Sequence, residues 1–407
     1  MSDIYRKGYV YVQDTFAGII EETKNGYCFT YDSQYLSNSL AKAVSLTLPL
    51  REKPYISKSL FPFFDGLIPE GYLLDKVVDN WNLKYKDRFG LLLVACKDCI
   101  GDVTIRNQIE SLKYLNSEYN TKCTIKTSSI LSEIDIIDIE LKELFDLSIN
   151  KGFTVPGVQK KVSFCISQEG CNLKDFILKP QTSEYASLPE YEELGMRLAD
   201  CVGINTVPHA LISINNQFAY ITKRIDKEYD SHTCNKYSME DFCQLANHLT
   251  IDKYKSSYEY CGKIINKYSS RPGIDVAEMF YRIIFSFVIG NSDMHLKNFS
   301  LIETFSGSRE FVLSDVYDML PVNVILPEDT EQMALTVNGK RKNILYKDFI
   351  ELANHCNIPE KVAVALIKKI CSYKDEMLKE VDESYLTEEQ KEKVKILVKE
   401  RINNLSK

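Results

Sequence analysis

A carboxylate and an amide stand five positions apart in the polar segment 291–298, between two apolar runs. Asp293 can accept the proton of an incoming hydroxyl, and Asn298 can turn its amide oxygen toward a metal ion held by phosphates. The alternative is an ordinary polar loop between two buried elements, since short motifs also occur by chance. The residues around this loop must therefore show whether it belongs to a larger site.

The spacing of Asp293 and Asn298 is typical of the catalytic loop of protein kinases. Such a site needs a further carboxylate for the metal, which a kinase supplies from the end of a later strand. Residues 311–321 predict a short strand that ends in acidic residues, and both Asp315 and Asp318 qualify by sequence. An acidic turn that faces solvent is the alternative for this segment.

Charged residues that suit a nucleotide precede the loop. Lys179 ends the apolar strand 176–180, where a charge without a partner would be costly. Segment 151–161 combines two glycines, a proline and two lysines, which suits contacts of backbone N–H groups and cations with an anion. The predicted helix 189–202 supplies three candidate partners for Lys179, namely Glu190, Glu192 and Glu193. A snorkelling surface lysine, solvated glutamates and a basic turn are the alternatives.

Hydrophobic patterning predicts a β-rich beginning and a helical end. Early strands are expected at 9–13, 17–23, 27–31 and 45–50, with an Asn25-Gly26 turn between the middle two. Later strands are expected at 207–214 and 218–222, and the second runs into Lys223, Arg224 and Ile225, where a kinase hinge would meet adenine. Helices are expected at 137–147, 239–249, 254–268, 274–289 and within 346–405.

The order of these features favours phosphoryl transfer over coincidence. A basic loop, a strand lysine, a helix glutamate, a hinge, the Asp293 loop and a strand-end aspartate follow one another as they do in protein kinases. We therefore predict an α+β protein with a bilobal, protein-kinase-like fold, a β-rich N-terminal subdomain and an all-helical C-terminal lobe. The predicted segments are 1–125, 126–228 and 229–407.

Composition limits the remaining classes of function. The net charge of −7 argues against a generally basic surface for nucleic acid. Since no apolar run is long enough to span a bilayer and no signal pattern opens the chain, we expect a cytoplasmic protein. The twelve cysteines are scattered, and the single C-x-x-C, Cys96 to Cys99, has no second pair with which to bind zinc.

The chain resembles the HipA family of serine/threonine kinases, which are the toxin components of bacterial toxin–antitoxin modules. The matching segments lie in both halves of the chain: FPFFDGLIPEG, DRFGLLL, PGVQKK, FILKP, EYEELGMRLA, NSDMHLKNFSL, VYDMLP and MALTVNGK. The resemblance implies ATP and Mg²⁺ as cofactors. It also implies a role for each residue at a matching position.

By this resemblance, Asp293 is the catalytic base, and Asn298 and Asp318 are the magnesium ligands. Asp318 is favoured over Asp315 because the family carries Tyr-Asp at this place. ATP contacts are implied for Pro156, Gly157, Val158, Gln159, Lys160, Lys161, Lys179, Glu192, Lys223, Arg224, Ile225, His295, Lys297 and Tyr317. Thr154 stands where family members carry an autophosphorylated serine, and Ser163 is a second candidate for self-phosphorylation. Lys223 departs from the usual acidic or apolar hinge residue.

The resemblance further implies two kinds of partner. One is a HipB-like helix-turn-helix antitoxin, through which the chain would meet operator DNA indirectly. The other is a protein substrate, such as an aminoacyl-tRNA synthetase or another translation component. No membrane partner is expected. Two alternatives remain: an antitoxin-binding corepressor with weak or no kinase activity, and a kinase of a lipid or small molecule.

Overall fold

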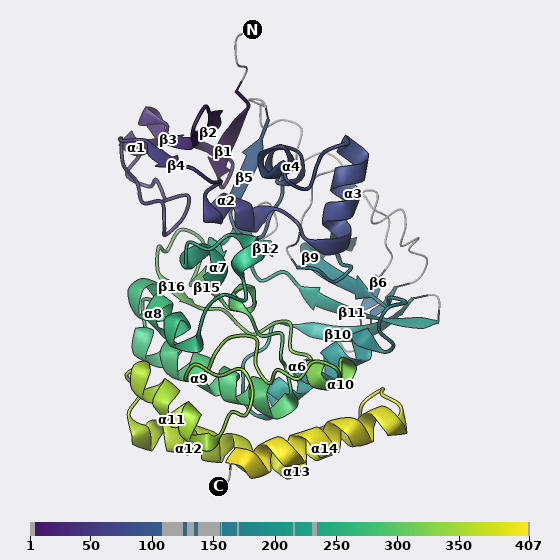
Figure 1. The fold of residues 1–407 in the computed structure, drawn as a ribbon. Coiled ribbons are helices and arrows are strands. Elements are labelled where there is room, and N and C mark those ends of the chain that lie inside the picture. Colours follow the sequence, from purple (N-terminus) through teal and green to yellow (C-terminus); the bar gives the residue numbers. More distant parts are fainter. Residues whose placement is uncertain are drawn as a thin grey trace. The chain divides into compact units, whose positions relative to one another are not determined.

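The computed structural model describes residues 5–107, 125–127, 134–136, 155, 157–168, 171–214, 216–229 and 234–405. The chain forms two compact units, each assembled from segments far apart in the sequence (Figure 1). Unit 1 comprises Met1–Lys179, Lys223–Thr250 and Ile302–Arg309, and unit 2 comprises Pro180–Thr222, Ile251–Leu301 and Glu310–Lys407. The predicted segments 1–125, 126–228 and 229–407 divide the chain differently, and they stay a prediction.

Helices and strands both occur throughout, which confirms the α+β class. The strands in the described residues are β1 (Lys7–Val12), β2 (Thr15–Thr23), β3 (Gly26–Tyr31), β4 (Tyr55–Ser57), β5 (Val103–Arg106), β6 (Ile125–Thr127), β7 (Ile134–Ile136), β8 (Val162–Gln168), β9 (Cys171–Pro180), β10 (His209–Ile214), β11 (Gln217–Lys223), β12 (Lys227–Tyr229), β13 (Cys234–Lys236), β14 (Met239–Asp241), β15 (Ser300–Glu303) and β16 (Phe311–Leu313). The α-helices there are α1 (Ser33–Ser37), α2 (Pro62–Leu67), α3 (Gly71–Trp81), α4 (Arg88–Ala95), α6 (Leu188–Cys201), α7 (Phe242–Leu245), α8 (Tyr258–Tyr268), α9 (Pro272–Ile289), α10 (Val322–Ile325), α11 (Tyr346–His355), α12 (Glu360–Ser372), α13 (Lys374–Asp382) and α14 (Glu388–Leu405).

Unit 1 contains an antiparallel sheet with the strand order β4-β3-β2-β1-β5. The turn Lys24-Asn25 joins β2 to β3, which begins at Gly26, so the predicted hairpin is confirmed. The prediction of a strand at 45–50 is wrong, because Ser45 and Leu48 form an isolated bridge and β4 pairs with β3 instead. Aromatic side chains of β3 and α2 then pack over the sheet, with the rings of Phe29 and Phe64 edge to face at 5.6 Å.

The segment 239–249 is a short strand followed by a short helix, and the prediction of one long helix is wrong. The carboxylate of Asp241 accepts the N–H of Gln244, and the Gln244 side chain accepts the N–H of Asp241. This capping box starts α7 after β14 has ended. The region 229–407 is therefore helical with short strands rather than all-helical. The predicted helix 137–147 lies outside the described residues.

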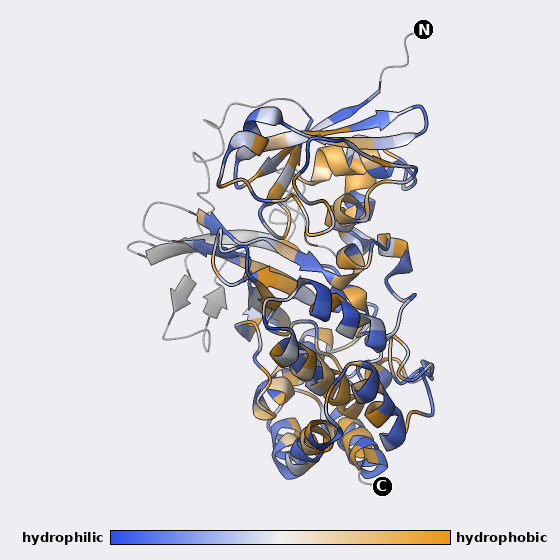
Figure 2. Cartoon of the chain, turned by 90° about the vertical axis from the view of Figure 1, so that its left-hand side faces the viewer, coloured by the Kyte–Doolittle hydropathy of each residue, from blue (hydrophilic) through white to orange (hydrophobic). Residues whose placement is uncertain are grey.

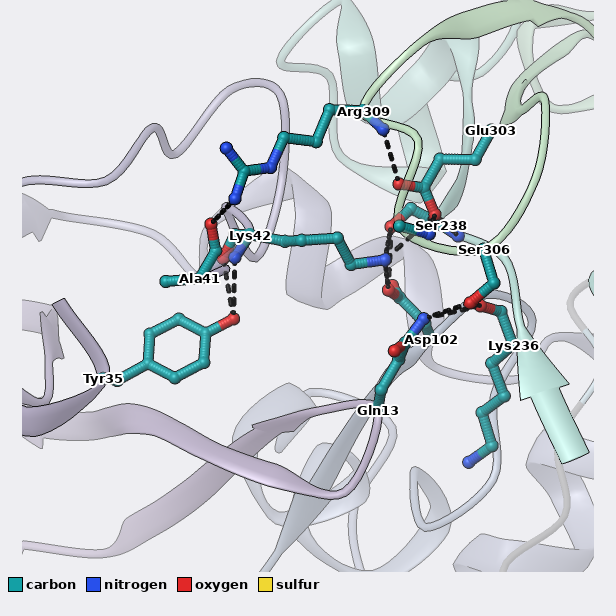
Figure 3. A network of polar contacts seen from close by, with 11 residues as sticks. Gln13, Tyr35, Ala41, Lys42, Asp102, Lys236, Ser238, Glu303, Ser306 and Arg309 are labelled. Carbon is teal, nitrogen blue, oxygen red and sulfur yellow. Dashed lines mark hydrogen bonds and ion pairs between the residues drawn. The ribbon is translucent and has the colours of Figure 1, made fainter. Parts of the chain in front are cut away.

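A buried polar network holds the loop that contains Lys42 within unit 1 (Figure 3). The Lys42 ammonium pairs with Asp102 at 2.5 Å and with Glu303 at 2.9 Å, and it donates to the Ser238 hydroxyl at 3.0 Å. Burial raises the pKa of Asp102, and the ammonium of Lys42 opposes that rise. The network joins the loop that contains Lys42 to segments that lie 196 and 261 residues later in the chain.

Lys42→Met is expected to lower the free energy of unfolding by about 3 kcal/mol or more, because two buried carboxylates lose their cation. Urea unfolding would measure this loss. Lys7→Met is the matched control, since Lys7 pairs with Glu21 at the protein surface and such pairs contribute about 0–1 kcal/mol. Equal losses in the two variants would contradict the stabilising role of the network.

Unit 2 is packed around α9, as the hydrophobic spacing predicts. Met279, Phe280, Ile283, Ile284 and Phe287 are fully buried on this helix. Helices α8, α12 and α14 contact α9, and the helices carry both apolar (orange) and polar (blue) residues in Figure 2. None of the described helices is long and apolar enough to cross a membrane.

Candidate active site

The loop after α9 folds around the main-chain carbonyl of Asp293. This carbonyl accepts the N–H of His295 at 2.7 Å and the side-chain amide of Asn298 at 3.0 Å. The N–H of Asp293 donates to the side-chain oxygen of Asn291 at 3.2 Å. His295, Lys297 and Asn298 are buried, whereas Asp293 is partly exposed. The loop thus holds its main chain rigidly and presents the Asp293 carboxylate at its accessible side.

The same loop contacts the segment that carries Asp318. The side-chain amide of Asn291 donates to the Asp318 carbonyl at 3.3 Å, and the Tyr317 hydroxyl donates to the Lys297 carbonyl at 3.1 Å. Asp318 has a φ of +57°, a strained conformation for a residue with a Cβ. Such strain is found preferentially at functional sites. These contacts bring Asp318 to the predicted catalytic loop, whereas Asp315 is exposed.

Helix α6 brings Glu192 close to the Asp318 segment within unit 2. Gly195 on this helix faces the Met319 carbonyl so closely that a Cβ would collide with it. Glu192 is fully buried, and its carboxylate and that of Asp318 both act on Tyr220. Burial first, and then these negative charges, raise the pKa of Tyr220 well above its usual range. Helix α6 and the Asp318 segment thus place two carboxylates, those of Glu192 and Asp318, near the Tyr220 phenol.

The predicted phosphate loop lies in unit 1 against the start of α3. Gly71, with a φ of +51°, approaches the Val158 carbonyl so closely that a Cβ would collide. The Lys160 ammonium lies 4.8 Å from the centre of the Tyr72 ring, in a cation–π contact. The side-chain amide nitrogen of Gln159 is buried and has no acceptor among the residues that the structure describes. Thr154 and Pro156 lie outside those residues.

Two lysines of unit 1 are buried rather than solvated. Lys179 is 3% exposed at the end of β9, so the alternative of a surface lysine does not hold. Lys161 is also buried, and its ammonium lies against Gly157 in the loop. A buried ammonium requires anionic or polar partners. Both side chains are therefore suited to binding phosphate oxygens.

The side chain of Arg224, in the predicted hinge, forms hydrogen bonds and ion pairs within unit 1. Its guanidinium donates to Asp226 at 2.6 and 3.0 Å and to the Cys99 carbonyl at 2.7 Å, with Asp98 at 3.4 Å. Burial would lower the pKa of Arg224, but Asp226 and Asp98 outweigh it and raise the pKa. An adenine contact from 223–225 would therefore use the main chain or the partly buried Lys223 and Ile225.

The chemistry of individual side chains in each unit is compatible with the predicted magnesium ion and phosphates. Because the amide nitrogen of Asn298 binds the Asp293 carbonyl, a metal ion would be held by the amide oxygen, and the Asp318 carboxylate is the candidate second ligand. Mg²⁺ is commonly held by one or two such side chains plus substrate phosphates. The buried amide nitrogen of Gln159 is a hydrogen-bond donor, and a phosphate oxygen would be a suitable acceptor for it.

Sequence reasoning missed two residues of this site. Asn291 joins the loop to Asp318, and its place in the NSDMHLKN motif could have indicated a role. Tyr254 donates a hydrogen bond to Asp293, and no pattern in the sequence marks it because 39 residues separate the two. Long-range contacts of this kind become visible in the folded chain alone.

Two family models match the chain. The HipA N-terminal domain matches residues 8–106, and the HipA-like C-terminal domain matches residues 153–377, which is more than half of the chain. The chain belongs to the HipA family. Among its relatives, the putative kinase Y4mE of Sinorhizobium fredii is 25% identical over 332 residues, covering 79% of this chain and 77% of that protein. The putative kinase Y4dM of the same organism is 25% identical over 358 residues, which cover 83% of this chain and 82% of that protein.

A solved structure shows the same fold. It is the Shewanella oneidensis HipA toxin in complex with HipB and operator DNA, with a TM-score of 0.74 and 15% sequence identity. The match covers 98% of this chain and 96% of that one. At this identity, the likeness confirms that the chain has the HipA fold across nearly its whole length.

Proposed function

We propose that this HipA-family protein is a serine/threonine protein kinase that uses ATP and Mg²⁺. The observation that carries the proposal is the hydrogen bond from Asn291 to the carbonyl of Asp318. This bond connects the loop that carries Asp293, the candidate base, and Asn298, a candidate metal ligand, to the segment that carries Asp318. Phosphoryl transfer requires such groups close together. The relatives Y4mE and Y4dM carry the name of putative kinase, which supports the same reaction here.

Each side chain would then have a defined task. Asn298 and Asp318 would hold the magnesium ion, which supplies positive charge to the phosphates. Lys179 would bind phosphate oxygens, and Glu192 would take the place of the helix glutamate of protein kinases. Asp293 would accept the proton of a serine or threonine hydroxyl while the new O–P bond forms and the bond from phosphorus to the ADP oxygen breaks. Positioning and electrostatic stabilisation supply most of the rate.

Of the two candidates for self-phosphorylation, the structure disfavours Ser163. It is 4% exposed on β8, and its hydroxyl lies 3.4 Å from the Arg224 guanidinium. Phosphate transfer to this hydroxyl would require the strand to open. We therefore propose Thr154, which stands at the family's modified position, as the first site of self-phosphorylation.

The partners follow from the family. We propose a HipB-like helix-turn-helix antitoxin as a binding partner, because the Shewanella structure is a complex of HipA, HipB and operator DNA. Contact with DNA would then be indirect, through the antitoxin. The protein substrate would be a translation component in the cytoplasm, such as an aminoacyl-tRNA synthetase. An antitoxin-binding corepressor with weak or no kinase activity is the second candidate function, and the same complex favours it.

Intact-mass measurement and peptide mapping after incubation with ATP would test the proposal. With Mg²⁺, the wild-type protein is expected to gain one phosphate in the peptide that contains Thr154. Excess EDTA is expected to abolish the gain, since the phosphates lose their metal. No gain of phosphate, together with no binding of Mg-ATP in calorimetry, would contradict the kinase and leave the corepressor.

A further inference from the structure

Tyr254 contacts two residues of the predicted catalytic loop within unit 2. Its hydroxyl donates to the Asp293 carboxylate at 2.5 Å, a short bond of the kind expected between a phenol and a charged acceptor. Its ring lies edge to face against the His295 imidazole, with 4.9 Å between the ring centres. Tyr254 is 37% exposed, so it reaches Asp293 from the side that solvent can enter.

A hairpin around 332–341 fixes the main chain of Tyr254. The Arg341 guanidinium donates to the Tyr254 carbonyl and pairs with Glu331 at 3.3 Å. Beyond Tyr254, the N–H of Tyr258 donates to the Thr336 carbonyl at 3.1 Å. Thr336 belongs to the MALTVNGK motif, and Arg341 directly follows it. The motif and the residue after it thus hold the segment that presents Tyr254.

The catalytic loop holds the same segment from its other side. The N–H of Leu296 donates to the Lys253 carbonyl at 3.3 Å, and the Tyr258 hydroxyl donates to the Met294 carbonyl at 2.9 Å. Tyr254 thus lies between two residues that contact the loop carrying Asp293, Lys253 through its carbonyl and Tyr258 through its hydroxyl. These contacts hold the main chain of Tyr254 next to that loop.

We infer that Tyr254 is a positioning residue for Asp293, an inference that rests on the proposed kinase function. The phenol engages Oδ1 of the carboxylate, which fixes the rotation of the side chain and turns Oδ2 toward the acceptor. During transfer, the acceptor hydroxyl gives its proton to Oδ2 as its oxygen bonds to the γ-phosphorus, and ADP leaves with the electrons of the broken P–O bond. The phenol keeps its own proton throughout.

Tyr254→Phe tests this role because it removes the hydroxyl and retains the ring against His295. The rate of phosphate transfer at saturating Mg-ATP is expected to fall about 10-fold, as misplacement of a reacting group does. The KM for ATP and the thermal midpoint are expected to stay at their wild-type values, since the phenol contacts neither nucleotide nor core. Tyr260→Phe is the matched control, because Tyr260 is 39% exposed on the neighbouring helix α8. Its rate is expected to be unchanged.

Each other outcome overturns the inference. A wild-type rate in Tyr254→Phe would show that Asp293 needs no positioning by the phenol, and a faster rate would show that the phenol competes with the acceptor. A joint fall of rate, ATP affinity and thermal midpoint would show a structural role. If the wild-type protein itself transfers no phosphate, the proposed function fails and this inference with it, whereas the first three results leave the kinase intact.

Discussion

Asp293→Asn is expected to lower the rate of phosphate transfer about 10²- to 10⁴-fold, the usual span for removal of a general base. The amide cannot accept the proton of the acceptor hydroxyl. Because the main-chain carbonyl of Asp293 makes the loop contacts to His295 and Asn298, the loop itself is expected to keep its conformation. Single-turnover transfer of labelled phosphate from ATP would measure the loss.

The binding of Mg-ATP separates this effect from misfolding. Calorimetry is expected to give the same affinity for Asp293→Asn as for the wild-type protein, because Asp293 is assigned to the acceptor hydroxyl and not to the phosphates. Near-normal turnover of the variant would show that another group accepts the proton. Loss of nucleotide binding together with turnover would instead place Asp293 among the metal ligands.

Asp318→Asn is expected to lower the transfer rate about 10²-fold or more, because the metal loses a charged ligand and with it part of the stabilisation of the transition state. The concentration of Mg²⁺ needed for half-maximal rate is expected to rise as well. Titration of activity with MgCl₂ would measure both changes. The strained φ of +57° at Asp318 suits asparagine, so the main chain is expected to tolerate this change.

Asp315→Asn is the matched control for Asp318→Asn. Both aspartates qualify as a metal ligand by sequence, but Asp315 is exposed and Asp318 is bound through its carbonyl to Asn291. Asp315→Asn is expected to retain the wild-type rate and the wild-type dependence on Mg²⁺. An exchange of the two results would assign the metal to Asp315 and contradict the role of Asp318 as its ligand.

Local features of this protein could be predicted from its sequence. The hairpin of β2 and β3, the buried face of α9 and the strand that carries Lys179 near its end all follow from turn chemistry or hydrophobic spacing over a few residues. The order of charged residues along the chain predicted the kind of chemistry, and motif resemblance predicted the family. Predictions failed at 45–50 and 239–249, where apolar runs are short and a bridge or a capping box decides the outcome.

Contacts between distant segments were decided by the tertiary structure. Hydrophobic spacing could not show that the Arg224 side chain is buried against Cys99, that Asn291 binds the Asp318 segment, or that Tyr254 reaches Asp293. Each of these contacts joins residues between 27 and 125 positions apart. The sequence by itself determined which chemical groups are available for catalysis, because it specifies the residue types and their spacing along the chain. Which partner each group binds depends on burial and hydrogen bonding across the folded chain, because a polar group that loses water must find its partner there.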